Sequence, residues 1–245
     1  MNMRKLIYNL LLSAVVLFPS CMEVDNFDAP TAHFTGRVID VTTGQNILAD
    51  QGEYRIRMWE KSYSLNPGNQ DIPVKQDGTF NNTKLFNGTY DIVPEGAWWP
   101  ADTIRLGIGK TVTENFEVTP YLKLTDFEAK MEDDSLKVSC RIVAPREDLP
   151  YTIMDIRPFL SLNQFCGAGN CISYYSSIAQ YKKNINSTWT KLPKEGDGKS
   201  KVYTFKLFVK PEYVYFVRMG ARVKDTFQKY NYTEIVKIEV PSLTK

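Results

Sequence analysis

Short runs in which apolar and polar residues alternate recur along most of the chain, separated by Gly, Asn, Asp and Pro. A period of two is typical of half-buried strands, and turn residues at this spacing favour β-sandwiches. Only residues 172–181 have helical character, and because this stretch is short and uncapped we predict no helix there. The pattern therefore predicts an all-β protein. The clearest runs are Ala32–Val41, Tyr54–Trp59, Gly88–Pro94, Val112–Val118, Leu136–Val143, Lys201–Val209, Tyr213–Val223 and Thr233–Val240.

The pattern changes near residue 119, within Val118-Thr-Pro-Tyr-Leu122. Before this point the turns are dense in Gly and Asn, and after it the strands lengthen and the turns become charged. We therefore predict two sandwich domains, residues 32–118 and 119–245. A long loop is expected at residues 161–200, and loops of that length are usually functional or disordered.

Three stretches of the first domain carry recognisable motifs. Gly36–Gly44 reads G-R-V-I-D-V-T-T-G, and Gln76–Phe80 and Leu85–Pro94 follow with Q-D-G-T-F and L-F-N-G-T-Y-D-I-V-P. Together they resemble the transthyretin-like sandwich of the carboxypeptidase regulatory-like family. The resemblance concerns fold and not chemistry.

The physical roles of the motif residues follow from strand geometry. Val38 and Asp40 lie on one face of their strand, because side chains alternate. Gly44 is expected to supply the positive φ that reverses the chain. The resemblance implies that two aromatic residues, Phe80 and Tyr90, pack inside the sandwich and that Gly78 and Gly88 make turns.

The amino-terminal segment has the features of an export signal. Arg4 and Lys5 precede the apolar run Leu6–Phe18, which is shorter than the ~20 residues of a membrane-spanning helix. A small residue then stands directly before Cys21, and acidic residues follow. This arrangement resembles the lipobox and surface-export signal of Bacteroidetes lipoproteins. It implies a signal peptide over residues 1–20, lipid on Cys21, an acidic tether over residues 21–31, and an outer-membrane location facing the cell exterior.

The lipobox, the first-domain motifs and the β-rich second half together resemble the DUF3823 lipoproteins of Bacteroidetes. That resemblance implies a transthyretin-like sandwich followed by an Ig- or fibronectin-like one, with Tyr215–Val223 as a late strand of the second. It also implies partners: a polysaccharide or oligosaccharide, a TonB-dependent (SusC-type) transporter and a SusD-like lipoprotein.

Charge and cysteine content narrow the function further. After removal of residues 1–20, the chain has 28 basic and 28 acidic residues, so no field steers nucleic acid or an anionic membrane. With Cys21 lipidated, Cys140, Cys166 and Cys171 remain. The Gly-Ala-Gly-Asn loop between the last two is flexible enough to close a disulfide, with free thiols as the alternative. No second Cys or His pair completes a metal site, so we expect none.

Residues able to carry catalysis are few. His33 is the one histidine, and no nucleophile-elbow or phosphate-loop motif occurs in its proper context, so we expect no cofactor and no catalytic residue. Glu132-Asp133-Asp134 is the tightest acidic cluster. We interpret it as an exposed hairpin turn, with a calcium-binding turn or a carboxylate pair for glycoside hydrolysis as the alternatives.

Aromatic residues in loops are the stronger indication of function. Trp98 and Trp99 follow a strand in a Gly/Pro-bounded segment, where neighbouring side chains point to opposite sides, so one indole is expected to anchor and the other to face solvent. An exposed indole suits the apolar face of a sugar ring. The alternative is that both pack between the domains. A second group of candidates lies in the 161–200 loop: Tyr174, Tyr175, Trp189 and the amide of Asn170.

Three functions are consistent with these observations. The first is a non-catalytic surface lipoprotein that binds or presents glycan beside its transporter. The second is a structural accessory that docks on the transporter complex and binds no sugar. The third is a glycoside hydrolase.

Overall fold

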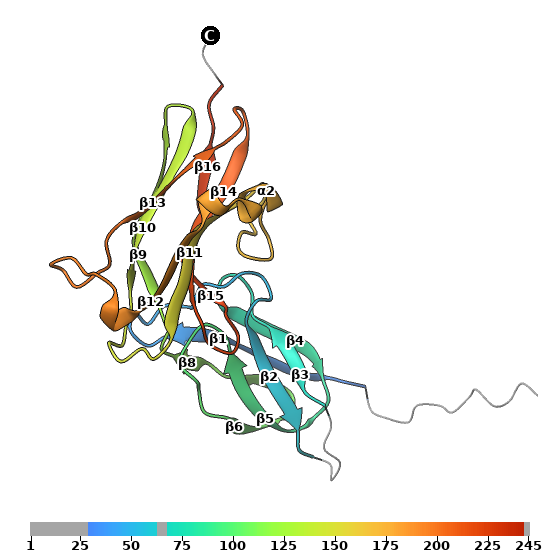
Figure 1. The fold of residues 1–245 in the computed structure, drawn as a ribbon. Helices are drawn as coiled ribbons and strands as arrows, with labels where there is room; N and C mark the ends of the chain where they lie inside the picture. Colours follow the sequence, from blue (N-terminus) through green and yellow to red (C-terminus); the bar gives the residue numbers. More distant parts are fainter. Residues whose placement is uncertain (1–28, 63–67, 243–245) are drawn as a thin grey trace, which may run out of the picture. The chain divides into compact units, whose positions relative to one another are not determined.

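The computed structural model describes residues 29–62 and 68–242, and Cys21 with the predicted signal peptide lies outside them. Within the described residues the chain forms sixteen strands and one five-residue helix, α2 (Ser173–Ser177) (Figure 1). Residues Thr31–Lys245 form one compact unit. The strands are β1 (Ala32–Asp40), β2 (Arg55–Glu60), β3 (Gln70–Pro73), β4 (Thr79–Leu85), β5 (Gly88–Glu95), β6 (Ile104–Ile108), β7 (Thr111–Thr113), β8 (Phe116–Val118), β9 (Lys123–Glu132), β10 (Ser135–Val143), β11 (Thr152–Ser161), β12 (Lys183–Thr188), β13 (Tyr203–Phe208), β14 (Val214–Val223), β15 (Tyr230–Tyr232) and β16 (Val236–Glu239).

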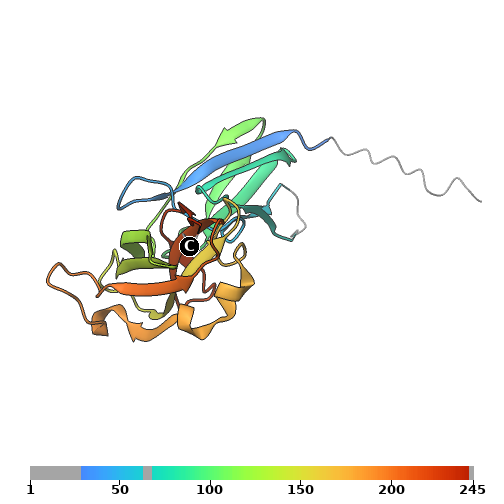
Figure 2. The ribbon, with the colours of Figure 1, turned by 90° about the horizontal axis from the view of Figure 1, so that it is seen from above.

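The first sandwich consists of two sheets. One has the order β4-β1-β7, with β8 also paired to β1, and the other has the order β3-β2-β5-β6. Side chains of β1 alternate as the sequence predicts: Phe34 and Val38 are buried and His33 is exposed. Figure 2 shows β1, in blue, beside β4, with which it pairs antiparallel. Phe80 and Tyr90 are fully buried, as the motifs imply.

The second sandwich also has two sheets, with the orders β13-β10-β9 and β12-β11-β14-β15, the latter extended by β16 on β14. Its core is made by alternate residues of facing strands such as Leu136, Ile156 and Val217. The acidic cluster lies at the β9–β10 turn, with Asp133 at φ 52°. Glu132 pairs with Lys137 at 2.9 Å. The cluster is therefore the predicted hairpin turn, and the all-β, two-sandwich expectation is confirmed.

Two details of the first sandwich differ from the sequence-based expectation. The predicted strand over residues 112–118 is divided, because β7 and β8 pair with β1 on either side of Gly36 and the Glu114 carbonyl lies against that glycine. Gly44 has positive φ as expected, and Gly78 lies in a turn as expected, also with positive φ. Gly88 does not make a turn as the motif implied, because it is the first residue of β5.

Residues 161–200 are not one long loop. They contain α2, two 3-10 turns at Ala179–Tyr181 and Trp189–Lys191, and β12, which pairs antiparallel with β11. The expectation failed because β12 reads Lys-Asn-Ile-Asn-Ser-Thr, and a polar composition is typical of an edge strand whose outer side meets water. The short helix was likewise not predicted.

Of the two alternatives for Cys166 and Cys171, a disulfide or free thiols, the structure has free thiols, and Cys140 is free as well. The Cys166 thiol is buried and directed at the carbonyls of Phe159 and Phe216, 3.3 and 3.4 Å away. The Cys171 thiol lies 3.8 Å from the Ala168 carbonyl instead. The two thiols thus have separate hydrogen-bond acceptors.

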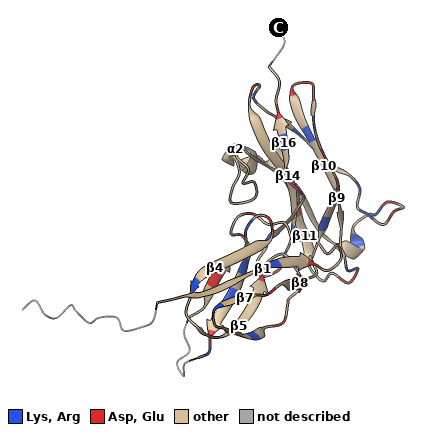
Figure 3. Ribbon diagram, turned by 180° about the vertical axis from the view of Figure 1, so that it is seen from behind, with Lys and Arg blue, Asp and Glu red and all other residues tan. Residues whose placement is uncertain are grey.

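Basic and acidic residues are interspersed on both sandwiches (Figure 3). In the part of the chain that the structure describes, no helix has the length and apolar character needed to cross a membrane.

Candidate functional site

The two tryptophans of the first sandwich are not exposed sugar platforms. Trp98 is 2% exposed, its ring packs edge-on against Tyr54 at 4.9 Å, and its indole N–H donates to the Pro94 carbonyl. Trp99 is half-buried against the core of the second sandwich, and the Arg146 guanidinium covers its ring at 3.8 Å. One indole therefore anchors in each core.

The aromatic candidates of the second sandwich are also divided. Trp189 and Tyr175 are buried in the core, and the Tyr175 hydroxyl donates to the Phe208 carbonyl at 2.6 Å. Tyr174 is 55% exposed, with its ring edge-on to Tyr175 at 5.2 Å. Of the sequence-predicted aromatic residues, Tyr174 alone offers a largely open ring among the described residues.

Asn170, the last predicted candidate, serves a different purpose. Its side-chain amide donates to Asp50 Oδ1 at 2.9 Å, and the backbone N–H groups of Gly169 and Asn170 donate to Asp50 Oδ2 at 2.6 and 3.2 Å. Asp50 is buried and comes from the first sandwich. Residues 166–170, which we call the strap, are therefore held by the first sandwich. The Asn170 amide nitrogen therefore serves the contact between the sandwiches.

Tyrosines and a glutamate make a second connection between the sandwiches. Glu53 accepts hydrogen bonds from the Tyr232 hydroxyl at 2.6 Å and the Tyr230 backbone N–H at 3.1 Å. The Tyr54 hydroxyl donates to the Tyr230 carbonyl. Burial raises the pKa of Glu53, and the hydrogen bonds from Tyr232 and Tyr230 partly oppose this effect. The arrangement makes the contact between the sandwiches polar as well as apolar.

Arg218 lies on β14 at the centre of this contact and is 1% exposed. Its Nη1 donates to the carbonyls of Ala49 and Cys166 at 2.8 and 3.0 Å, and its Nε donates to the Thr233 carbonyl at 3.2 Å. The guanidinium lies 4.0 Å from the centre of the Tyr232 ring. Burial lowers the pKa of Arg218, because desolvation disfavours the charged form.

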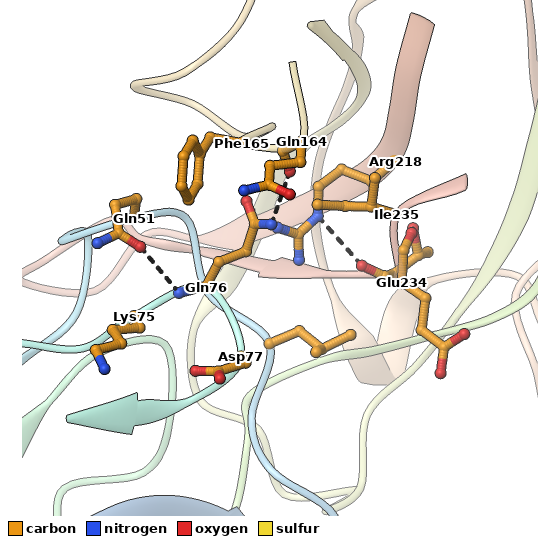
Figure 4. Close-up of a pocket in the computed structure, with 11 residues that line it drawn as sticks. Gln51, Lys75, Gln76, Asp77, Gln164, Phe165, Arg218, Glu234 and Ile235 are labelled. Atoms are coloured by element: carbon orange, nitrogen blue, oxygen red, sulfur yellow. Dashed lines mark hydrogen bonds between the residues drawn. The ribbon is translucent and has the colours of Figure 1, made fainter. Parts of the chain in front are cut away.

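A pocket of about 650 Å³ opens beside Arg218. Figure 4 shows its wall, with residues from both sandwiches directed toward one another. The first sandwich contributes the loop before β2 and the β3–β4 turn, and the second contributes the two residues before the strap, β14 and the β15–β16 connection. The lining residues are Leu48, Gln51, Lys75, Gln76, Asp77, Gln164, Phe165, Arg218, Thr233, Glu234 and Ile235.

Gln76 organises the floor of the pocket. Its amide nitrogen donates to the Gln164 carbonyl at 2.9 Å, and its amide oxygen accepts from the Cys166 backbone N–H at 3.0 Å (Figure 4). This pairing imitates one rung of a β-ladder and seats the strap segment on the first sandwich. The Gln51 side-chain oxygen accepts from the Gln76 backbone N–H at 3.3 Å. Gln76 is thus structural, and it places its neighbours Gln164 and Phe165 at the pocket.

The groups left for a ligand are an aromatic ring and several polar ends. Phe165 is 40% exposed. The side chains of Gln164 and Glu234 are exposed and form no hydrogen bond or ion pair within the described residues. An apolar ring beside planar amides and charged groups is the composition of a site for a polar, ring-shaped ligand. The geometry of the pocket therefore supports binding of such a ligand.

The pocket was not predicted from the sequence. Gln164 and the strap lie in the segment that we favoured, but Arg218 and Gln76 were not singled out. Strand alternation carries no signal for Arg218, because it alternates with Val217 and Met219, which face the core, and therefore reads as an outward position. The remaining lining residues come from turns whose mutual positions the sequence does not reveal.

Comparison with known protein families identifies the family of this chain. The family model of the DUF3823 N-terminal domain matches residues 32–119, and that of the DUF3823 C-terminal domain matches residues 122–237. Both are described as being of unknown function. The chain belongs to the DUF3823 family. The Asp50 contacts and the pocket therefore join the two domains of a DUF3823 protein.

Solved structures resemble this DUF3823 chain along most of its length. A DUF3823 family protein from Bacteroides uniformis superimposes with a TM-score of 0.72 at 23% identity, covering 86% of this chain and 100% of that one. A DUF3823 family protein from Parabacteroides merdae gives a TM-score of 0.64 at 20% identity with the same coverage. At these identities the likeness shows the fold.

A further structure from Bacteroides uniformis is described as "a putative carbohydrate binding protein". It superimposes with a TM-score of 0.70 at 17% identity and covers 86% of this chain and 100% of that one. No curated protein gives a significant match to this DUF3823 chain. No catalytic family is indicated by these comparisons.

Proposed function

We propose that this DUF3823 chain is a non-catalytic glycan-binding lipoprotein of the outer-membrane surface. The pocket beside Arg218 is the observation that carries the proposal. It combines the exposed ring of Phe165 with the free amide of Gln164 in a cavity of about 650 Å³, a size suited to one or two sugar rings. The description of one structural neighbour as a carbohydrate binder supports the same reading.

The location and partners belong to the proposal as well. Lipid on Cys21 anchors the chain, the acidic tether of residues 21–31 leads to β1, and the protein faces the cell exterior. A TonB-dependent transporter and a SusD-like lipoprotein receive the glycan. These statements are supported by the lipobox-like segment and by membership of the DUF3823 family.

Asp77, one of the two acidic residues at the pocket, is unsuited to the role of a catalytic acid. Asp77 Oδ1 accepts hydrogen bonds from the backbone N–H and hydroxyl of Thr79, at 3.0 and 2.7 Å. Burial acts to raise the pKa of Asp77, but these hydrogen bonds outweigh it and the pKa is lowered. A glycosidase needs a general acid with a raised pKa. Asp77 is therefore suited to closing its turn and not to protonating a leaving group.

The test is calorimetry of the full chain against a panel of polysaccharides. Phe165→Ala should weaken binding roughly ten-fold, equivalent to about 1.4 kcal/mol, and Gln164→Ala should weaken it as well. Tyr174→Ala is the matched control, since it removes an exposed ring that does not line the pocket. If Tyr174→Ala abolished binding and Phe165→Ala left it unchanged, the site would lie at α2. Binding to no glycan would refute the proposed function.

One observation favours the structural alternative, a docking accessory. Large apolar side chains are exposed at one region of the second sandwich: Phe208 at 60%, with Tyr213, Val214 and Tyr174. Tyr174 and Phe208 both contact the buried Tyr175, through its ring and its hydroxyl respectively. Co-purification of transporter subunits that is lost in Phe208→Asp, but retained in Phe165→Ala, would support this function.

A further inference from the structure

The hydrogen-bond inventory of Arg218 is incomplete at one nitrogen. A guanidinium has five N–H donors. The Nε hydrogen and both Nη1 hydrogens are used by the carbonyls of Thr233, Ala49 and Cys166. Nη2 has no hydrogen-bond partner among the described residues. It is also not fully enclosed by protein atoms. Since Arg218 lines the pocket (Figure 4), Nη2 is accessible from the pocket floor.

The charge of Arg218 is also uncompensated by direct contact. Within residues 29–62 and 68–242 it forms no salt bridge. Two acids lie in the same region, the buried Asp50 and the half-buried Glu53, but both are committed elsewhere. Asp50 accepts from Gln51, Gly169 and Asn170, and Glu53 accepts from Tyr230 and Tyr232. Burying a charge without a partner is costly, so an acidic group that reached Nη2 would gain strongly.

The other charged residues of the pocket have a weaker influence. Lys75, Asp77 and Glu234 are exposed, and their charges sum to one negative. Water and salt screen charges at an exposed rim, whereas a charge in a dry floor acts at a low effective dielectric constant. The floor therefore sets the preference of the pocket for charge.

We propose that the pocket selects acidic glycans, with Arg218 Nη2 binding an anionic substituent of the sugar, a uronate carboxylate or a sulfate ester, while Phe165 and Gln164 contact the ring. This inference rests on the proposed glycan-binding function and specifies its substrate class. Charge-assisted hydrogen bonds from guanidinium to such oxyanions are among the strongest that side chains make.

The sharpest test changes the ligand, because Arg218 also joins three backbone carbonyls and its replacement would test folding together with binding. Calorimetry of the full chain compares an oligogalacturonide with the same oligosaccharide after reduction of its carboxyl groups. A chondroitin sulfate oligosaccharide and its desulfated form make the second pair. In at least one pair, removal of the charge should weaken binding roughly ten- to a hundredfold.

A variant at the rim gives an independent measurement. Glu234 has a free carboxylate at the pocket, so Glu234→Gln should strengthen binding of the acidic probe roughly two- to five-fold at low salt and leave the neutral probe unchanged. Glu117→Gln is the matched control, an exposed acid on β8 that does not line the pocket. It should change neither.

The outcomes separate this inference from the function beneath it. Equal binding of the two members within both pairs, where reduction removes the carboxylate and desulfation removes the sulfate but keeps the uronate, would overturn the acidic specificity and leave glycan binding standing. Binding to neither member of either pair, nor to the wider panel, would overturn both. Loss in the carboxylate pair alone assigns the substituent as uronate, and loss in the sulfate pair alone assigns it as a sulfate ester.

Discussion

Replacing Asp50 with alanine removes the carboxylate that joins the two sandwiches. Asp50 is buried and accepts hydrogen bonds from the backbone N–H groups of Gly169 and Asn170 and from the Asn170 side chain. It also accepts from the Gln51 backbone N–H at 2.8 Å. Asp50→Ala should therefore release the strap from the first sandwich and lower the stability of the whole compact unit.

The magnitude follows from the number of donors left without an acceptor. Three donors cross between the sandwiches, and each hydrogen bond to a charged acceptor contributes about 1.5–3 kcal/mol. Because the strap residues Gly169 and Asn170 are not buried, water takes over part of their hydrogen bonding. We therefore expect a loss of about 3–4 kcal/mol, near the upper end for a single substitution. At this chain length the loss corresponds to a decrease in Tm of roughly 10 °C.

The assay is urea and thermal unfolding followed by circular dichroism, with Asp102→Ala as control because Asp102 is exposed and has no partner within the described residues. A double-mutant cycle with Asn170→Ala isolates the direct interaction, for which we expect a coupling of about 1 kcal/mol or more. If Asp50→Ala behaved like Asp102→Ala, or if the coupling were zero, Asp50 would not join the sandwiches and the reasoning would be wrong.

Three further predictions concern glycine, tryptophan and cysteine positions. Gly36→Ala should lower the free energy of unfolding by at least ~3 kcal/mol in a urea titration, because the new Cβ would lie 1.7 Å from a backbone oxygen. Gly107→Ala is the control: its Cβ would meet nothing within 4 Å, so the loss should be under ~0.5 kcal/mol. Equal effects of the two substitutions would contradict the packing. Trp98→Ala should cost about 3–5 kcal/mol and leave glycan affinity of the folded protein unchanged; weaker binding without lost stability would restore it as a sugar contact. Burial raises the pKa of Cys166 from 9.0 to about 12 and also raises that of Cys140. Above pH 9 the folded state therefore binds more protons than the unfolded state. The free energy of unfolding should be unaffected below that pH and should fall above it by about 1 kcal/mol per thiol and pH unit. Urea midpoints that stay constant from pH 8 to 10 would contradict this.

The strand pattern and the first-domain motifs could be predicted from sequence because they depend on local rules. Alternation along β1 buries Phe34 and Val38, and Gly44 occupies a turn that requires positive φ. These properties follow from side-chain direction and backbone sterics within a few residues. The same local reasoning placed the acidic cluster in a hairpin turn.

The fate of the loop aromatics was decided by distant residues. Trp98 is buried because Tyr54 lies beside it, and Trp99 is covered by Arg146. An exposed and a buried tryptophan look alike in sequence, since burial depends on what packs against the ring. The edge strand β12 was missed for a related reason. It is a strand because it pairs with β11, and its polar sequence alone does not indicate that pairing.

The sequence by itself determined that the chain forms two β-sandwiches, and it located strands such as β1, β5 and β14 and the turn at Gly44. Tertiary structure alone decided the site. Gln76, Gln164 and Arg218 meet at one pocket although they are far apart in the chain, and Asp50 holds a strap more than a hundred residues away. Strand formation is a local consequence of side-chain alternation, whereas a pocket requires a particular docking of surfaces, which depends on hydrogen bonds and packing between residues distant in sequence.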